Sequence, residues 1–84
     1  MTTPVTYILR CADDTLYIGS TNDIEKRIHE HNHLKSGAHY TKIRRPVELV
    51  YSEIFETLSE ARKRECAIKK LTRAQKLSLM KSKA

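Results

Sequence analysis

The segment from residue 5 to residue 31 limits what this 84-residue chain can fold into more than any other part. Its β-branched and aromatic residues and its small polar turn predict a strand over Val5–Cys11, a turn over Ala12–Asp14 and a strand over Leu16–Ser20. Asn22 and Glu25 then have the spacing of a capping box, which predicts a helix from near Asp23 to about Asn32. A β-hairpin that runs straight into a helix therefore opens the chain.

The remainder of the sequence predicts one more strand and two more helices. Val47–Phe55 has the composition of a strand. Capping-box patterns at Thr57–Glu60 and Thr72–Gln75 predict the starts of two further helices. We therefore expect a single domain over residues 1–84, of the α+β class, with a small three-stranded antiparallel sheet flanked by helices in the order ββαβαα.

The net charge of +6 is concentrated at the C-terminal end of the chain. Residues 1–59 hold seven Lys/Arg and eight Asp/Glu, whereas residues 60–84 hold nine Lys/Arg and two Asp/Glu. Such asymmetry suits a polyanionic partner, most simply nucleic acid, because its phosphates attract basic side chains regardless of sequence. A solvated helix surface is the alternative explanation of the same charges. An anionic membrane is a poorer match, because no bulky apolar stripe accompanies them.

Several other classes of protein do not fit the sequence. The first residues lack the basic and apolar regions of a signal peptide. No apolar run approaches the roughly 20 residues needed to span a bilayer. Cys11 and Cys66 are too few and too far apart for a disulfide scaffold or a CxxC metal site. We therefore expect a cytoplasmic protein with reduced thiols.

The length of the hairpin loop decides how two tyrosines are placed. With the odd-numbered loop Ala12–Asp14, Tyr7 pairs with Gly19 and Leu9 with Tyr17. Tyr7 and Tyr17 then project from the same face of the sheet, whereas an even-numbered loop would send them to opposite faces. Packing is the commoner use of strand tyrosines. Gly19 indicates either a close approach to its backbone or a β-bulge.

The first predicted helix carries an arginine and a histidine beside its apolar stripe. At about 100° per residue, the four residues within one arc of roughly 100° are Ile24, Arg27, Ile28 and His31. A helix docked on the sheet would place Arg27 and His31 at the border of the sheet, where a helix built only for stability would tend to carry Leu or Ala. A snorkelling arginine with a partly buried structural histidine is the alternative.

Glu65 is an anomaly on the second predicted helix, because it shares the apolar face. Helical spacing places it between the directions of Leu58 and Ala61. An inward carboxylate needs a counter-charge, a proton or a metal ion. An ion pair with an arginine such as Arg27 or Arg62 is the structural alternative to a metal site.

Two further groups of residues are candidates for ligand binding. The loop over residues 37–45 interleaves aromatic and basic side chains, which suits phosphate contact and base stacking, although an ordinary exposed loop explains it equally well. The C-terminal helices add further basic side chains. The candidates for nucleic-acid binding are His39, Tyr40, Lys42, Arg44, Arg45, Lys69, Lys70 and Arg73. His29 and His33 share a helix face, but no cysteine or acidic third ligand for zinc is obvious nearby.

Taken together, these residues resemble the GIY-YIG nuclease superfamily, especially its small single-domain branch, over nearly the whole chain. Tyr17-Ile18-Gly19 matches the second signature triplet, and Tyr7 falls at the tyrosine of the first. Arg27, ten residues after Tyr17, matches the arginine of the family. His31 matches a position that is often His or Tyr, and Glu65 matches the metal-binding glutamate.

The sequence departs from the family pattern at two places. The first triplet reads Val5-Thr6-Tyr7, so its Gly and Ile are missing, which can alter how closely the backbone approaches a ligand. Ser20 stands where some members carry Lys, which removes one possible phosphate contact.

The resemblance implies a divalent-metal-dependent endonuclease that hydrolyses phosphodiester bonds in nucleic acid, DNA rather than RNA. Glu65 would hold one Mg²⁺ or Mn²⁺ against the phosphate, and Arg27 would stabilise the charge that develops there. Tyr17, with Tyr7 or His31, would position or deprotonate the attacking water. Because a phenol of pKa ~10 is a poor base at pH 7, His31 competes for this role. The alternatives are a non-catalytic nucleic-acid-binding module and a protein-interaction adaptor.

Overall fold

The computed structural model describes residues 3–33 and 45–81, which form three strands and three helices. In chain order these are β1 (Val5–Arg10), β2 (Leu16–Thr21), α1 (Ile24–His33), β3 (Glu48–Ile54), α3 (Leu58–Lys69) and α4 (Arg73–Lys81). The order ββαβαα and the α+β class are as predicted, and the predicted ends of the three strands and of the first helix lie within two residues of those observed.

The three strands form one antiparallel sheet in the order β2-β1-β3, so β1 is central and β2 is an edge strand. Tyr7 pairs with Gly19 and Leu9 with Tyr17, which confirms the register predicted from the odd loop length. On its other side β1 pairs with β3, and a bulge shifts that register between Ile8 and Leu9.

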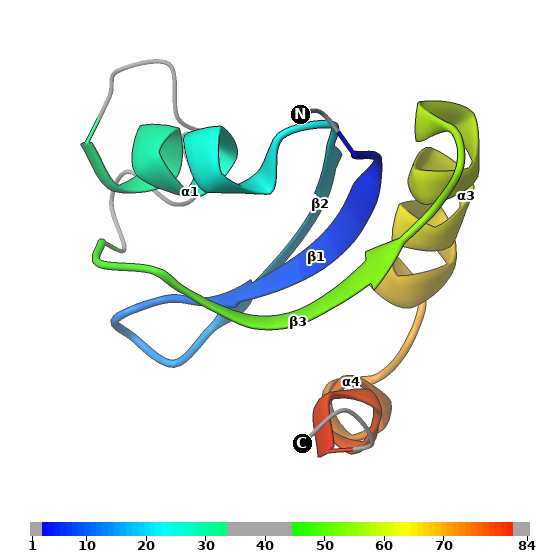
Figure 1. Ribbon diagram of the computed structural model, residues 1–84. Helices are drawn as coiled ribbons and strands as arrows, with labels where there is room; N and C mark the ends of the chain where they lie inside the picture. Colours follow the sequence, from blue (N-terminus) through cyan, green and yellow to red (C-terminus); the bar gives the residue numbers. More distant parts are fainter. Residues whose placement is uncertain (1–2, 34–44, 82–84) are drawn as a thin grey trace.

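Helices cover both faces of the sheet, because the side chains of β1 alternate between the two faces. On one face Val5, Tyr7 and Leu9 form an apolar cluster against which α1 packs. On the other face Ile8 packs with Ile68 of α3. Figure 1 shows α1 and α3 on opposite sides of the sheet, so the central strand contributes to two small cores.

Side-chain hydrogen bonds cap the N-termini of α3 and α4, as the sequence predicts. At α3 the Thr57 hydroxyl oxygen accepts a hydrogen bond from the Glu60 amide at 3.2 Å, and the Glu60 carboxylate accepts one from the Thr57 amide at 3.2 Å. At α4 the Thr72 amide donates to the Gln75 side chain at 2.9 Å, and the Gln75 amide donates to the Thr72 hydroxyl oxygen at 3.2 Å. Both predicted capping boxes are therefore confirmed.

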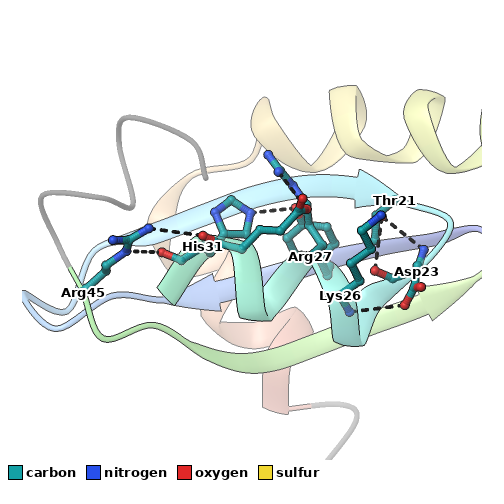
Figure 2. A network of polar contacts seen from close by, with 8 residues as sticks. Thr21, Asp23, Lys26, Arg27, His31 and Arg45 are labelled. Atoms are coloured by element: carbon teal, nitrogen blue, oxygen red, sulfur yellow. Dashed lines mark hydrogen bonds and ion pairs between the residues drawn. The ribbon is translucent and has the colours of Figure 1, made fainter. Parts of the chain in front are cut away.

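The cap of α1 differs from the prediction. Asp23 is the capping residue, because its Oδ1 accepts a hydrogen bond from the Lys26 amide at 3.2 Å. The Asp23 amide in turn donates to Thr21 Oγ1 at 3.1 Å, which turns the chain out of β2 (Figure 2). The capping box predicted from Asn22 and Glu25 is wrong, and its physical replacement is the Asp23–Lys26 pair.

Neither cysteine forms a disulfide, and Cys11 is buried whereas Cys66 is exposed. Within residues 3–33 and 45–81, no helix has both the length and the apolar character that crossing a membrane requires.

Candidate active site at the β2 edge

Tyr7 and Tyr17 lie on one face of the sheet, and both of their rings contact His31 of α1. The His31 ring lies edge-on to both phenols, with centroid distances of 6.1 Å to Tyr7 and 5.1 Å to Tyr17. The Tyr7 hydroxyl and His31 Nε2 are 3.1 Å apart and form a buried hydrogen bond. The common face predicted for the two tyrosines is confirmed.

The absence of a side chain at Gly19 lets Tyr7 reach across the edge strand. A Cβ at this position would lie 2.5 Å from the Tyr7 hydroxyl oxygen and 2.7 Å from its Cζ, closer than atoms can pack. Because Tyr7 belongs to the central strand, its ring extends over the backbone of β2 toward the sheet edge. Of the two alternatives predicted for Gly19, close approach is the one found, and the approaching group is Tyr7.

Burial makes His31 and Tyr7 poor general bases near neutral pH. His31 is completely buried, because α1 packs closely enough on the sheet for its ring to meet both phenols. Burial, and then the charge of Arg27, lower the pKa of His31 to about 4, so its imidazole is neutral at pH 7. Burial raises the pKa of Tyr7 to about 12.

Arg27 lies one helical turn before His31, where it borders the phenols. Its side chain is 27% exposed, and its Nη1 is 3.3 Å from the Glu30 carboxylate. Burial opposes the charge on Arg27, but its hydrogen bonds to Tyr7 and Glu30 outweigh this and raise its pKa. In Figure 2, Arg27 and His31 rise from the same side of α1. The cluster therefore has a permanent cation at its solvent boundary.

Glu65 of α3 is the mostly buried carboxylate that helical spacing predicts, with 19% of its side chain exposed. The Ser20 hydroxyl donates a hydrogen bond to Glu65 Oε1 at 2.5 Å. The Lys69 ammonium is 2.7 Å from Glu65 Oε2, so the counter-charge comes from the same helix, one turn later. Arg62, one of the arginines considered for this role, is instead exposed on α3.

Two groups of side chains meet at β2. The tyrosine cluster consists of Tyr7, Tyr17, Arg27 and His31, and the Glu65 cluster consists of Ser20, Glu65 and Lys69. Tyr17 packs on the α1 face of the sheet, whereas Ser20 of the same strand reaches Glu65 on the α3 face. Across this edge strand the charges interact, because the Glu65 charge adds to the effect of burial in raising the pKa of Tyr7. The structure therefore brings together Tyr7, Tyr17, Arg27 and His31 on one face, while Glu65 contacts the same edge strand from the other face through Ser20.

The chemistry of these donors suits a weakly held Mg²⁺ or Mn²⁺. Mg²⁺ commonly binds through one or two carboxylates, while waters and substrate phosphates complete its octahedron. Glu65 supplies one carboxylate with the Ser20 oxygen beside it. Within the described parts of the chain, no group of three His, Cys, Asp or Glu side chains could hold a metal ion. The His29 and His33 rings lie 4.8 Å apart between centroids, but they belong to no such group there. Glu65 would therefore hold a cation together with a bound phosphate.

The residues predicted to contact nucleic acid fall into two sets, those outside the described residues and those whose contacts the structure gives. Those outside the described residues are His39, Tyr40, Lys42 and Arg44. Arg45 donates to two main-chain carbonyls at the end of α1, as Figure 2 shows. Lys69 pairs with Glu65, Lys70 is exposed, and Arg73 donates to a main-chain carbonyl of the β1–β2 turn at 2.9 Å.

Sequence reasoning missed two contacts of Glu65. The pairing with Lys69 follows from the i, i+4 spacing of a glutamate and a lysine on one helix, which is a sequence signal for an ion pair. Strand alternation predicts only that Ser20 faces away from the face of Gly19. Its contact with Glu65 also depends on the docking of α3 beside β2, which no local pattern in the sequence gives.

Comparisons with known proteins give one matching family model and several similar proteins and structures. A family model described as the GIY-YIG catalytic domain matches residues 3–78. A UPF0213 protein of Syntrophus aciditrophicus is 59% identical over 75 residues, which cover 89% of this chain and 86% of that protein. A UPF0213 protein of Clostridium perfringens is 58% identical over 78 residues, which cover 93% of this chain and 83% of that protein.

The solution NMR structure of a protein from E. faecalis has a TM-score of 0.65 at 42% identity, over 98% of this chain and 86% of that chain. The solution NMR structure of a UPF0213 protein from Bacillus halodurans has a TM-score of 0.62 at 37% identity, over 96% and 85%.

Proposed function

The chain belongs to the GIY-YIG family, and on this basis we propose that it is a divalent-metal-dependent endonuclease that hydrolyses phosphodiester bonds in nucleic acid, DNA rather than RNA. The observation that carries the proposal is the Glu65 carboxylate, which is mostly buried and accepts a hydrogen bond from Ser20 of the edge strand that also carries Tyr17. A buried carboxylate is costly for a domain that needs only stability.

Glu65 and Arg27 supply the charges that phosphodiester cleavage requires. In this proposal Glu65 would hold Mg²⁺ or Mn²⁺, and such a cation would supply Lewis-acid stabilisation of the phosphate and the leaving oxygen. Arg27 donates to a non-bridging phosphate oxygen and offsets the charge that develops as water attacks. The side chains of both residues are partly open to solvent, at 19% and 27%, so a substrate can reach them.

Tyr17 is the phenol best suited to orient or deprotonate the attacking water. It is only partly buried and lies on the edge strand, whereas Tyr7 is 1% exposed and His31 is 0% exposed. The hydrogen bond between Tyr7 and His31, and the contact of His31 with the Tyr17 ring, hold that ring in place. We assign Tyr17 as the catalytic phenol, with Tyr7 and His31 as positioning residues.

A cleavage screen tests this function. The wild type should cut at least one of branched, single-stranded or duplex DNA in the presence of Mn²⁺, with matched RNA substrates as the comparison. Arg27→Ala should lose at least about 100-fold in rate, and Glu65→Gln should fall to background. Glu56→Gln removes an exposed carboxylate between β3 and α3 and is the matched control, so it should cut like the wild type. Equal cleavage by wild type, Arg27→Ala and Glu65→Gln would identify a contaminating nuclease and refute the assignment.

A non-catalytic nucleic-acid-binding module is the second candidate. It is favoured by the Glu65–Lys69 ion pair, which gives the carboxylate a counter-charge without any metal. This function predicts salt-dependent binding without turnover, and little change in binding for Glu65→Gln. The same screen separates the two functions, because only the nuclease loses activity when Glu65 is changed.

A further inference from the structure

We propose that Lys69 is a ligand for the substrate phosphate and that its ion pair with Glu65 keeps it from the phosphate until a metal binds. A divalent cation releases Lys69 by replacing its ammonium on the Glu65 carboxylate. This inference rests on the proposed nuclease function and adds a residue and an order of events to it. Binding of the metal and readiness for the substrate would then be coupled through one side chain.

Both oxygens of the Glu65 carboxylate are engaged in the structure. Oε1 accepts a hydrogen bond from the Ser20 hydroxyl at 2.5 Å, and Oε2 is 2.7 Å from the Lys69 ammonium. The hydroxyl carries no charge and can turn its oxygen toward a cation. The ammonium has no acceptor to offer, and a divalent cation on the same carboxylate would repel it. Cation binding at Glu65 therefore displaces Lys69.

Lys69 can move without disturbing the fold. Its side chain is 54% exposed, against 19% for Glu65, and its four-carbon stem carries three rotatable donors. Lys69 is anchored at the end of α3, one turn after Glu65, which contacts the edge strand through Ser20, so the released ammonium stays within reach of that edge. A phosphate bound to a cation on Glu65 would present its remaining oxygens to this ammonium.

The helix offers a matched control for Lys69. Lys63 is exposed on the same helix and has the same charge, but it lies about 160° from Glu65 around the helix axis. Lys63→Met and Lys69→Met therefore remove the same charge from α3 while only the second frees the Glu65 carboxylate.

Mn²⁺ binding without nucleic acid tests the first half of the inference, by following the free-ion EPR signal. Lys69→Met should bind Mn²⁺ about two- to fivefold more tightly than the wild type, as expected for loss of a partly exposed ion pair that the metal must break. Lys63→Met should bind as the wild type does, and Glu65→Gln should lose the site. Unchanged or weaker binding by Lys69→Met, or a wild type without a Glu65-dependent site, would overturn the inference.

Cleavage at saturating Mn²⁺ tests the second half. Lys69→Met should lose about tenfold or more in rate despite its tighter metal binding, whereas Lys69→Arg should retain part of the activity and Lys63→Met nearly all of it. A structural defect would weaken both properties, so opposite signs are the signature of the exchange. Wild-type cleavage by Lys69→Met would overturn the inference while leaving the nuclease function intact. A wild type that cuts nothing, with Mn²⁺ binding still tightened in Lys69→Met, would refute the nuclease function and keep only the exchange.

Discussion

His31 is a buried, uncharged imidazole, and it makes folding stability depend on pH. Its pKa is about 4 in the folded protein, lowered from 6.5 by burial first and then by the Arg27 charge. Between these pH values the unfolded chain binds a proton that the folded chain does not. Its contribution to stability is therefore complete above pH 6.5 and is lost as the pH falls toward 4. Through this residue we expect a loss of about 1 kcal/mol between roughly pH 7.5 and 5.5.

Urea unfolding at two pH values measures this loss. His31→Gln cannot titrate, so its stability should fall by about 1 kcal/mol less than that of the wild type over the same interval, whatever its absolute stability. His33→Gln, at an exposed position of the same helix, is the control and should keep the wild-type dependence. An identical pH dependence in His31→Gln and wild type would contradict a neutral buried imidazole.

At the scale of single residues, the sequence predicted which way these side chains point, but not how deeply they are buried. The common face of Tyr7 and Tyr17 follows from the parity of the hairpin loop, which is local information. The direction of His31 follows from helical spacing. Its complete burial depends on how closely α1 docks and on the two phenols that meet its ring, which are contacts between elements.

At the scale of elements, α1 shows how a cap is chosen between neighbouring residues. Asn22 and Asp23 are equally good N-cap residues by type, so the sequence pattern alone favours neither. The hydrogen bond from the Asp23 amide to Thr21 Oγ1 separates them. The capping boxes at the starts of α3 and α4 were predicted correctly because their pattern is complete within four residues.

Two alanine substitutions test this choice. Asp23→Ala removes the acceptor of the Lys26 amide and should destabilise the fold by about 1 kcal/mol. Asn22→Ala changes an exposed side chain that is not the cap and should alter stability by less than about 0.5 kcal/mol. Urea midpoints of the two variants measure the difference, and a larger effect at Asn22 would show that the helix starts one residue earlier.

At the scale of the whole molecule, the candidate site is assembled from both helical layers around one edge strand. Sequence reasoning identified Glu65 as inward and the tyrosines as sharing a face, but it could not say which strand lies at the edge. That depends on the long-range pairing of β1 with β3, which leaves β2 outermost. The position of β2 keeps Tyr17 partly exposed and brings Ser20 to Glu65, so topology joins two clusters that local patterns describe separately.

The same topology determines which basic side chains of α3 lie on the flank beside β2. Glu65 contacts β2 through Ser20, while Arg64 pairs with Glu53 of β3 at 3.0 Å, so the two flanks of the helix face different strands. Arg62 lies about 60° from Glu65 around the helix axis and therefore on the β2 flank. Lys63, about 160° from Glu65, points away from the sheet. A nucleic acid that crosses the β2 edge would pass Arg62 and miss Lys63.

Salt-dependent DNA binding in EDTA, measured by fluorescence anisotropy, tests this path. Arg62→Ala should weaken binding and reduce the slope of log K against log salt by about 0.7 to 0.9, which corresponds to one lost phosphate contact. Lys63→Ala removes an equal charge and should leave the slope nearly unchanged. Because both residues are exposed on one helix, their general electrostatic attraction is matched, and only a bound strand on the β2 side separates them. Equal changes in the two slopes would mean that the basic helices attract nucleic acid without directing it across the Glu65 edge.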